Sequence, residues 1–158
     1  MKKNAIIWDI DNTLLDTRHL FEQDSLDYFY EHCNDDEVPV IDKAKKFLDS
    51  LNHSQYYKRE NYLEDGTSSI ERLDYVTILL TARNEHNREA TEDKLADAGI
   101  GYDYLLMRAD DDFREPPEVK RDYLIKLMEE YDIVAFIDDD SWNCAMARDL
   151  GLLAFMVV

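Results

Sequence analysis

The stretch "IIWDIDNTLLDT", residues 6–17, runs three apolar residues directly into two aspartates, Asp9 and Asp11, with Thr13 two residues further on. Burying carboxylates at the end of a hydrophobic strand is costly unless they meet a cation or take part in chemistry. Residues two apart in an extended chain point the same way and lie roughly 6–7 Å apart. The stretch therefore predicts a buried strand that delivers two carboxylates to one place.

Further apolar runs indicate a sheet around this strand. The runs are "AIIWDI" (5–10), "YVTILLT" (75–81), "IVAFID" (133–138) and "LLAFMVV" (152–158), with "YDYLLM" (102–107) as a weaker fifth. Segments with helical start and stop signals alternate with them at 85–99, 116–131 and 141–151. Continuous apolar strands interleaved with helices predict an α/β fold of three layers, in which helices cover both faces of a central parallel sheet.

The segment 14–75 breaks this alternation. It contains a predicted helix near 18–32 and another near 40–51, followed by a polar, tyrosine-rich stretch at 52–69 with no clear period. We interpret 14–75 as a small, mostly helical insertion after the first strand, within a single domain that spans 1–158. For the tyrosines, partly buried packing is favoured over stacking on a base, because tyrosine is amphipathic.

Composition narrows the class of protein. The chain of 158 residues is 45% apolar and carries a formal net charge of -18, which predicts a folded globular protein that repels polyanions at long range. A local cluster of arginines around one phosphate stays compatible with that charge. No apolar run could span a bilayer, and the N-terminus does not resemble a signal peptide. Cys33 and Cys144 lie far apart, which favours free thiols in the cytoplasm but leaves a disulfide open. No membrane association and no protein partner are predicted.

Polar side chains follow the predicted strands where ligands bind in parallel sheets, at the carboxyl ends. Four of them, which would repel one another without a cation, are the carboxylates Asp9, Asp11, Asp138 and Asp139. Mg²⁺ prefers oxygen ligands and bridges to substrate phosphate, so we expect these four to form a Mg²⁺ site. Asp140, the next acid, is expected to cap the following helix.

This arrangement suits phosphoryl transfer. Asp9 would attack phosphorus, and Asp11 would protonate the departing alcohol and then deprotonate the water that releases phosphate. Thr81 and Lys120 would hold the equatorial phosphoryl oxygens, where charge spreads in the transition state. Thr13 adds a hydroxyl donor for the substrate phosphate.

These motifs resemble those of the haloacid dehalogenase (HAD) superfamily of phosphotransferases, and they appear in the order that the superfamily requires. "DIDNT" (9–13) matches the first motif, "LLTARNE" (79–85) the second, Lys120 the third and "FIDDDSWN" (136–143) the fourth. The resemblance implies a HAD-like, Rossmann-like fold with Asp9 as nucleophile and Asp11 as acid/base. It also implies a metal-binding role for Asp138 and Asp139, with Asn143 at a familiar offset.

A finer resemblance is to the phosphatase domain of bacteriophage-type polynucleotide kinase/phosphatases, which removes 3'-phosphates from nucleic-acid ends. It rests on Arg83 after the second motif, Met107-Arg108 after the next strand, the acidic stretch that ends at Arg114, and Val119-Lys120. The resemblance implies that Arg83, Arg108 and Arg114 are candidates for binding substrate. It predicts a polynucleotide 3'-phosphatase that acts on a phosphorylated nucleic-acid 3' end or nucleotide.

Three alternatives stay open. Pro116 and Pro117 replace acidic residues of the phage pattern, no kinase-type glycine-rich loop is present, and the strongly negative charge favours small substrates. A mononucleotide or deoxynucleotide phosphatase is therefore the first alternative. A phospho-acceptor receiver domain is more distant, because receivers place the metal-binding acidic pair first and the phosphorylated aspartate later. A silent acidic interaction protein is the third, and the intact motifs argue against it.

Overall fold

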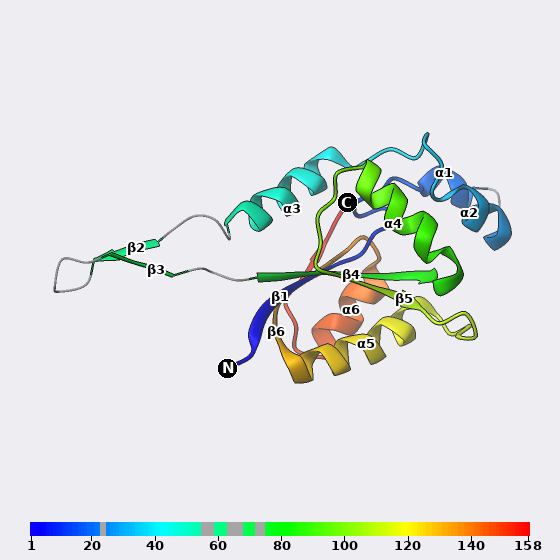
Figure 1. Ribbon diagram of the computed structural model, residues 1–158. Helices are drawn as coiled ribbons and strands as arrows, with labels where there is room; N and C mark the ends of the chain where they lie inside the picture. The colour runs from blue at the N-terminus through cyan, green and yellow to red at the C-terminus, as the bar shows by residue number, and fades with distance from the viewer. Residues whose placement is uncertain (23–24, 55–58, 63–67, 72–74) are drawn as a thin grey trace.

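The central feature of the molecule is a five-stranded parallel sheet. The computed structural model describes residues 1–22, 25–54, 59–62, 68–71 and 75–158 (Figure 1). The strands of the sheet are β1 (Lys3–Trp8), β4 (Tyr75–Asn84), β5 (Tyr104–Arg108), β6 (Tyr131–Asp138) and β7 (Ala154–Met156). Their order is β5-β4-β1-β6-β7 and every neighbouring pair is parallel. The predicted α/β fold is confirmed, with the first strand at its centre.

Helices cover both faces of this sheet. The helices are α3 (Asp42–Ser54) and α4 (Arg88–Asp97), preceded by the short η1 (Glu85–Asn87), and α5 (Pro116–Glu130) and α6 (Ser141–Asp149). Figure 1 shows α3 and α4 on one side of the strands and α5 and α6 on the other. The molecule therefore has the three layers that the sequence predicts.

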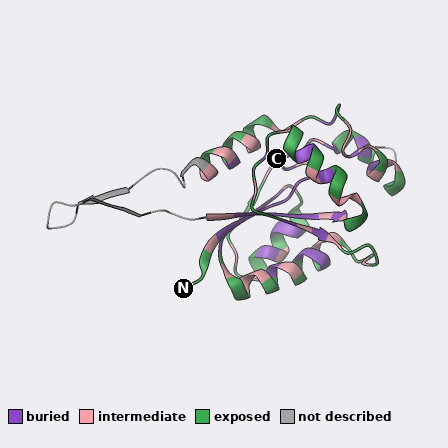
Figure 2. Cartoon of the chain, viewed as in Figure 1, coloured by how far each residue is buried: buried purple, intermediate pink, exposed green. Residues whose placement is uncertain are grey.

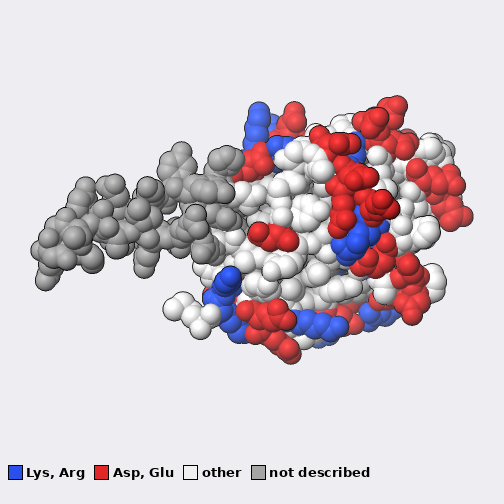
Figure 3. Space-filling view, viewed as in Figure 1, with Lys and Arg blue, Asp and Glu red and all other residues white. Residues whose placement is uncertain are grey.

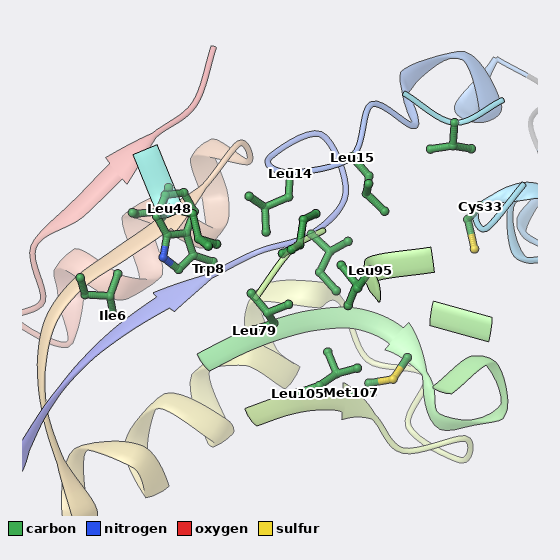
Figure 4. Close-up of a cluster of buried hydrophobic side chains, with 14 of the residues drawn as sticks. Ile6, Trp8, Leu14, Leu15, Cys33, Leu48, Leu79, Leu95, Leu105 and Met107 are labelled. Carbon is green, nitrogen blue, oxygen red and sulfur yellow. The ribbon is translucent and has the colours of Figure 1, made fainter. Parts of the chain in front are cut away.

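Two separate clusters of buried side chains hold the layers together. Toward α3 and α4, Ile6 and Trp8 of β1 pack in one cluster with Leu79, Leu95 and Leu48, and Figure 4 shows Trp8, Leu79 and Leu95 projecting between the sheet and the helices. Each large apolar side chain that is fully buried contributes about 1.5–3 kcal/mol. This face is thus a packed hydrophobic core.

The opposite face has a core of its own. Ala5 and Ile7, which alternate with Ile6 and Trp8 along β1, pack in a cluster with Leu124 of α5 and Ala147 of α6. Figure 2 shows buried residues along the strands and on the sheet-facing sides of these helices. Because both faces of β1 are covered, its sequence is continuously apolar instead of alternating.

The two cysteines belong to different cores. Cys33 is part of the cluster under α4, Cys144 is part of the cluster under α6, and both are buried free thiols. Of the two possibilities that the sequence leaves open, the structure has the free thiols.

The chain between β1 and β4 contains more than the predicted helices. It forms α1 (Arg18–Phe21), α2 (Leu26–His32) and α3, and also an antiparallel pair, β2 (Arg59–Tyr62) and β3 (Ser68–Glu71), which extends away from the sheet in Figure 1. Ser25 starts α2, since its Oγ accepts a hydrogen bond from the Tyr28 amide at 3.2 Å. The single helix predicted near 18–32 is therefore two short ones. The predicted packing role of the tyrosines at 52–69 lies outside the described side chains.

The turn after β1 differs from the sequence expectation. The Ile10 carbonyl accepts hydrogen bonds from the Thr13, Leu14 and Leu15 amides at 3.2, 2.8 and 3.0 Å. Asn12 adopts a left-handed conformation with φ of 61°, which asparagine tolerates better than most residues. The regular strand thus ends at Trp8, so Asp9 and Asp11 follow β1 and do not lie within it.

Within the described residues, no helix combines the length and apolar character needed to cross a bilayer. On the face shown in Figure 3, acidic side chains gather over α4, while basic ones are interspersed along α5. Acidic side chains on this face are therefore solvated.

Candidate active site

Three carboxylates meet where β1 and β6 end. Trp8 pairs with Ile137 in the sheet, so Asp9 and Asp138, one residue beyond each, reach the same edge. Oxygens of Asp9, Asp138 and Asp139 lie within 4.8 Å of one another. Asp9 and Asp138 are buried and Asp139 is half-buried. We call these three residues the acid trio.

Lys120 lies inside the acid trio, although α5 supplies it from a distant part of the chain. Its Nζ is 2.7 Å from Asp9 Oδ1 and 2.7 Å from Asp138 Oδ2, and its side chain is 2% exposed. Burial alone would lower the pKa of Lys120, but the charges of Asp9 and Asp138 outweigh it and raise that pKa. Lys120 therefore stays protonated and bridges two of the acids.

One ammonium does not balance three acids. Burial raises the pKa of Asp9 well above its usual value, Lys120 opposes this, and the charge of Asp138 adds to it. Burial and the neighbouring Asp138 charge likewise raise the pKa of Asp139 to about 6. With all three acids ionised, the trio and Lys120 carry an excess of two negative charges. A divalent cation would supply the missing positive charge.

A neighbouring amide oxygen supports a cation in the same place. Asn143 donates from Nδ2 to Asp138 Oδ1 and Oδ2 at 3.2 and 3.1 Å. Its Oδ1 is buried, faces no hydrogen-bond donor among the described residues, and belongs to a residue that lines the cavity over the trio. A buried acceptor without a partner costs about 1–3 kcal/mol. Carboxylate and amide oxygens are ligands of hard divalent cations, so this donor set fits Mg²⁺ or Ca²⁺.

Asp11 lies apart from the acid trio. Its Oδ1 is 2.7 Å from Arg83 Nη2, its Oδ2 is 2.9 Å from Arg83 Nε, and Thr17 Oγ1 donates to Oδ1 at 3.2 Å. The turn after β1 and the attraction of the Arg83 charge explain this position. The structure brings together three of the four carboxylates predicted to share a metal, and the side chain of Asp11 is not among them.

The two predicted threonines are both fully buried. Thr13 Oγ1 donates to Asp9 Oδ2 at 3.2 Å, which orients the predicted nucleophile. Thr81 Oγ1 accepts a hydrogen bond from the Arg83 amide at 3.1 Å and lies next to Ala82, which lines the cavity. Thr81 keeps its hydroxyl proton available for another acceptor.

The three predicted substrate-binding arginines occupy different environments. Arg83 is buried and Arg108 half-buried, and both line the cavity over the trio. Arg108 donates from Nε to the Ala82 carbonyl at 3.0 Å, while its Nη2 donates to none of the described residues. Arg114 pairs with Asp112 and Asp122 at the surface and does not line this cavity. Of the three, Arg108 has a donor left for a ligand.

The cavity has a volume of about 260 Å³, and part of its wall is apolar. Phe21 of α1 and Leu26, Phe29 and Tyr30 of α2 form that wall, and the Phe21 and Phe29 rings stack with centroids 4.9 Å apart. Sequence reasoning missed these residues. The spacing of Leu26, Phe29 and Tyr30 at i, i+3 and i+4 marks one face of a short helix and could have identified them.

Known proteins resemble the chain in family and in fold. A family model described as HAD superfamily, subfamily IIIB (acid phosphatase), matches residues 1–144. A chain in the structure of a Pnkp1/Rnl/Hen1 complex is 26% identical with a TM-score of 0.72, covering 99% of this chain and 46% of that one. A chain in the structure of the Pnkp1/Rnl/Hen1 RNA repair complex is 25% identical with a TM-score of 0.73, covering 99% of this chain and 42% of that one. This chain therefore spans less than half the length of either.

A more distant structure shares the fold alone. The class C acid phosphatase from Bacillus anthracis with tungstate bound is 20% identical with a TM-score of 0.58, covering 90% of this chain and 54% of that one. None of the curated proteins compared with the chain matches it significantly.

Proposed function

The chain belongs to subfamily IIIB of the HAD superfamily, the acid phosphatases, and on this premise we propose that it is a Mg²⁺-dependent phosphomonoesterase acting through an aspartyl-phosphate on Asp9. The observation that carries the proposal is the acid trio with Lys120, whose Nζ lies 2.7 Å from both Asp9 and Asp138. Such a site combines a buried carboxylate nucleophile with fixed positive charge for a phosphoryl group.

Formation of the aspartyl-phosphate is the first step. A carboxylate oxygen of Asp9 forms a bond to phosphorus while the bond from phosphorus to the leaving oxygen breaks. Thr81 and Lys120 hold the equatorial oxygens, where negative charge spreads. Mg²⁺, when held by Asp9, Asp138 and Asp139, would neutralise charge on the phosphoryl oxygens. The unpartnered Asn143 Oδ1 supports a ligand at this place.

Asp11 handles the proton in both steps. It gives a proton to the leaving oxygen, so that an alcohol departs. It then accepts a proton from water, whose oxygen bonds to phosphorus as the bond from phosphorus to Asp9 breaks. Inorganic phosphate and the original Asp9 carboxylate result. The position of Asp11 on the cavity wall, with its side chain 16% exposed, supports this role.

We propose a phosphorylated nucleic-acid 3' end as the substrate. The support is the similarity, at 26% and 25% identity, to chains in the Pnkp1/Rnl/Hen1 structures, one of which is named as an RNA repair complex. Within the cavity, Arg108 has a free donor for a phosphate, and the wall formed by Phe21, Leu26, Phe29 and Tyr30 offers an apolar surface to a nucleoside. The free, buried thiols fit the cytoplasmic location that we expect from the sequence.

A mononucleotide phosphatase is the second candidate. The net charge of -18 disfavours a long polyanion, and a cavity of about 260 Å³ suits a small ligand. These two observations favour a single nucleotide over a strand end.

A substrate panel tests both candidates. Phosphate release would be measured from p-nitrophenyl phosphate, from 3'- and 5'-mononucleotides and from oligonucleotides phosphorylated at either end, with Mg²⁺ and with chelator. We expect Mg²⁺-dependent turnover and a kcat/KM at least tenfold higher for the 3'-phosphorylated oligonucleotide than for the mononucleotides. The reverse preference would support the nucleotidase. A single turnover that leaves a stable phosphoprotein would contradict both and indicate a receiver-like protein.

A further inference from the structure

We infer that Arg83 is a positioning residue, which holds the Asp11 carboxylate in place for proton transfer and ties it to the insertion, and that it does not bind the substrate phosphate. The inference rests on the proposed function, because it concerns the proton step of that reaction. It assigns to Arg83 a role different from the one that the sequence resemblance implies.

Arg83 has no hydrogen-bond donor left for a ligand. Nε and Nη2 bind Asp11, and Nη2 also donates to the Cys33 carbonyl at 3.2 Å. Nη1 donates to Asn34 Oδ1 at 2.5 Å and to Thr91 Oγ1 at 3.3 Å. A guanidinium has five N–H groups, and these contacts use all of them. A phosphate would have to displace one of these partners.

The side chain of Arg83 is also buried. Arg83 is 1% exposed, and the Phe29 ring lies over its guanidinium with a centroid distance of 5.9 Å. Burial would lower the pKa of Arg83, but the Asp11 charge and its hydrogen bonds raise it instead. A buried charge persists in a fold only when a partner compensates it. Asp11 and Arg83 therefore compensate each other's charge, and removing either residue leaves the other as an unpaired charge.

The two carboxylate oxygens of Asp11 differ in their hydrogen-bond partners. Oδ1 accepts hydrogen bonds from Arg83 Nη2, from Thr17 Oγ1 and, at 3.3 Å, from Arg83 Nε. Among the described residues, Oδ2 accepts only from Arg83 Nε, at 2.9 Å. A two-point contact to a planar guanidinium fixes the rotation of a carboxylate. Asp11 lines the cavity, so Oδ2 keeps a lone pair for the proton that the reaction moves.

The contacts of Arg83 also join separate elements. Arg83 belongs to β4, Cys33 and Asn34 follow α2 in the insertion, and Thr91 lies in α4. Asp11 follows β1. The Arg83 side chain thus fixes the turn after β1, which contains Asp11, and the chain after α2 relative to the sheet. It therefore fixes the position of the Asp11 carboxylate relative to the cavity wall formed by α2.

The test uses the basicity of the leaving group. An aryl phosphate such as p-nitrophenyl phosphate departs with little help, whereas an alkyl phosphate needs a proton from Asp11. For Arg83→Gln we expect kcat/KM to fall at least 100-fold for an alkyl phosphate and less than fivefold for the aryl phosphate. Arg83→Lys keeps the charge but loses the two-point guanidinium contact, so it should lower kcat/KM for the alkyl phosphate selectively, by a smaller factor than Arg83→Gln. Arg88→Gln, a nearby arginine paired with Glu85 and Glu92, should change neither.

A double-mutant cycle separates positioning from other roles. In an Asp11→Asn background, Arg83→Lys should produce no further change in the ratio of aryl to alkyl kcat/KM. If instead Arg83→Lys and Arg83→Gln lower kcat/KM equally for both esters, through KM or through unfolding, the positioning role is overturned.

A milder variant covers the case in which Arg83→Gln does not fold. Thr17→Val removes the hydroxyl on Asp11 Oδ1 and leaves Arg83 in place, and we expect a loss of about threefold to tenfold confined to the alkyl ester. An equal effect on both esters would overturn the inference. If the wild type releases phosphate from neither ester, the proposed function itself fails. An active wild type with equal losses refutes only the role of Arg83.

Discussion

Single residues decide what the site can do, and Lys120 shows this most directly. Its ammonium contacts Asp9 and Asp138 at 2.7 Å each, in a place from which solvent is excluded. In such surroundings each contact is stronger than it would be in water. The same environment makes the loss of any one partner costly for the others.

The nucleophile can be tested by one substitution. Asp9→Asn should lower kcat for phosphate release at least roughly a thousandfold, because an amide cannot form the aspartyl-phosphate. The fold should persist, since Lys120 keeps Asp138 as a partner. Phosphate release and thermal melting measure the two effects. Asp149 is an exposed acid of α6, so Asp149→Asn serves as the matched control and should behave as wild type. Turnover retained in Asp9→Asn would refute the assignment.

The left-handed backbone conformation of Asn12, in the turn after β1, leads to a second prediction. Asn12 has φ of 61° and its Oδ1 accepts a hydrogen bond from the Thr17 amide at 3.0 Å. Asn12→Ala and Asn12→Gly both lose that bond, but glycine adopts the conformation without strain. We expect the alanine variant to be less stable than the glycine variant by about 1–2 kcal/mol in urea unfolding. Equal stabilities would show that the backbone conformation is not a constraint.

Thiol reactivity gives a prediction about pH. Burial, opposed by the Arg83 charge, raises the pKa of the Cys33 thiol to about 11. Below that pKa the protonated form dominates, so at pH 8 the reactive thiolate is about one part in a thousand. Native protein should therefore alkylate slowly with iodoacetamide at pH 8, and faster by about tenfold per pH unit as pH rises toward the pKa. Mass spectrometry would follow the reaction, with urea-unfolded protein as the control. Rapid native labelling at pH 8 would contradict the buried position.

At this scale the sequence predicts some residues and not others, for a physical reason. Asp9, Asp138 and Lys120 are predictable because strand ends in a parallel sheet converge on one edge. The contact of Asp11 with Arg83 is not predictable, because it depends on a turn whose hydrogen bonds to the Ile10 carbonyl are not visible in the sequence. The environment of Arg83 depends on an insertion folded back over it, which is a tertiary property.

Among the elements, α6 links stability to the site. Asp140 caps this helix, since its Oδ1 accepts hydrogen bonds from the Trp142 and Asn143 amides at 2.7 and 3.1 Å. The expectation that Asp140 is a capping residue agrees with these contacts. Because Asn143 lies in the first turn of α6, the same cap holds Asn143 Oδ1, which has no hydrogen-bond partner among the described residues, near the acid trio.

Removing this cap should weaken two properties together. Asp140→Ala should lower the free energy of unfolding by about 1 kcal/mol, the usual value of an N-cap. It should also weaken Mg²⁺ binding, measured by titration calorimetry, because Asn143 would lose its anchor. Asp140→Ser keeps a capping oxygen and should recover most of the stability. A variant that loses stability but binds Mg²⁺ as the wild type does would separate α6 from the metal site.

The predictability of elements follows from their burial. The sheet strands are predictable because their apolar runs mark buried segments, most clearly in β1, β4 and β6, which lie inside the sheet. The β2–β3 pair was missed because its segments, "RENY" and "SSIE", are short and polar. The division of the helix near 18–32 depends on the Ser25 cap, a signal that the apolar pattern alone does not include.

At the scale of the whole molecule, charge governs cation binding. The protein carries a net charge of -18, and the trio with Lys120 accounts for two of these negative charges when its acids are ionised. A cation that binds only the folded protein stabilises it by mass action. Folding stability and activity should therefore both respond to divalent ions, but to different degrees.

Chelation tests this response. With EDTA, phosphate release should stop and the melting temperature should fall by a few degrees, while circular dichroism at 25 °C should stay unchanged. Adding Mg²⁺ should restore both activity and melting temperature. Asp139→Asn, which removes one ligand from the trio, should shrink the Mg²⁺-dependent rise in melting temperature. Full activity in EDTA would rule out the proposed cofactor.

The contacts of Lys120 with Asp9 and Asp138 have a consequence for folding in the cell. Because the ammonium already ties two of the acids together, the polypeptide can complete its synthesis and fold without waiting for an ion. Under the proposed Mg²⁺ dependence, a cell short of magnesium would then hold folded but inactive enzyme. Recovery would take only as long as an ion needs to diffuse in, with no new translation required.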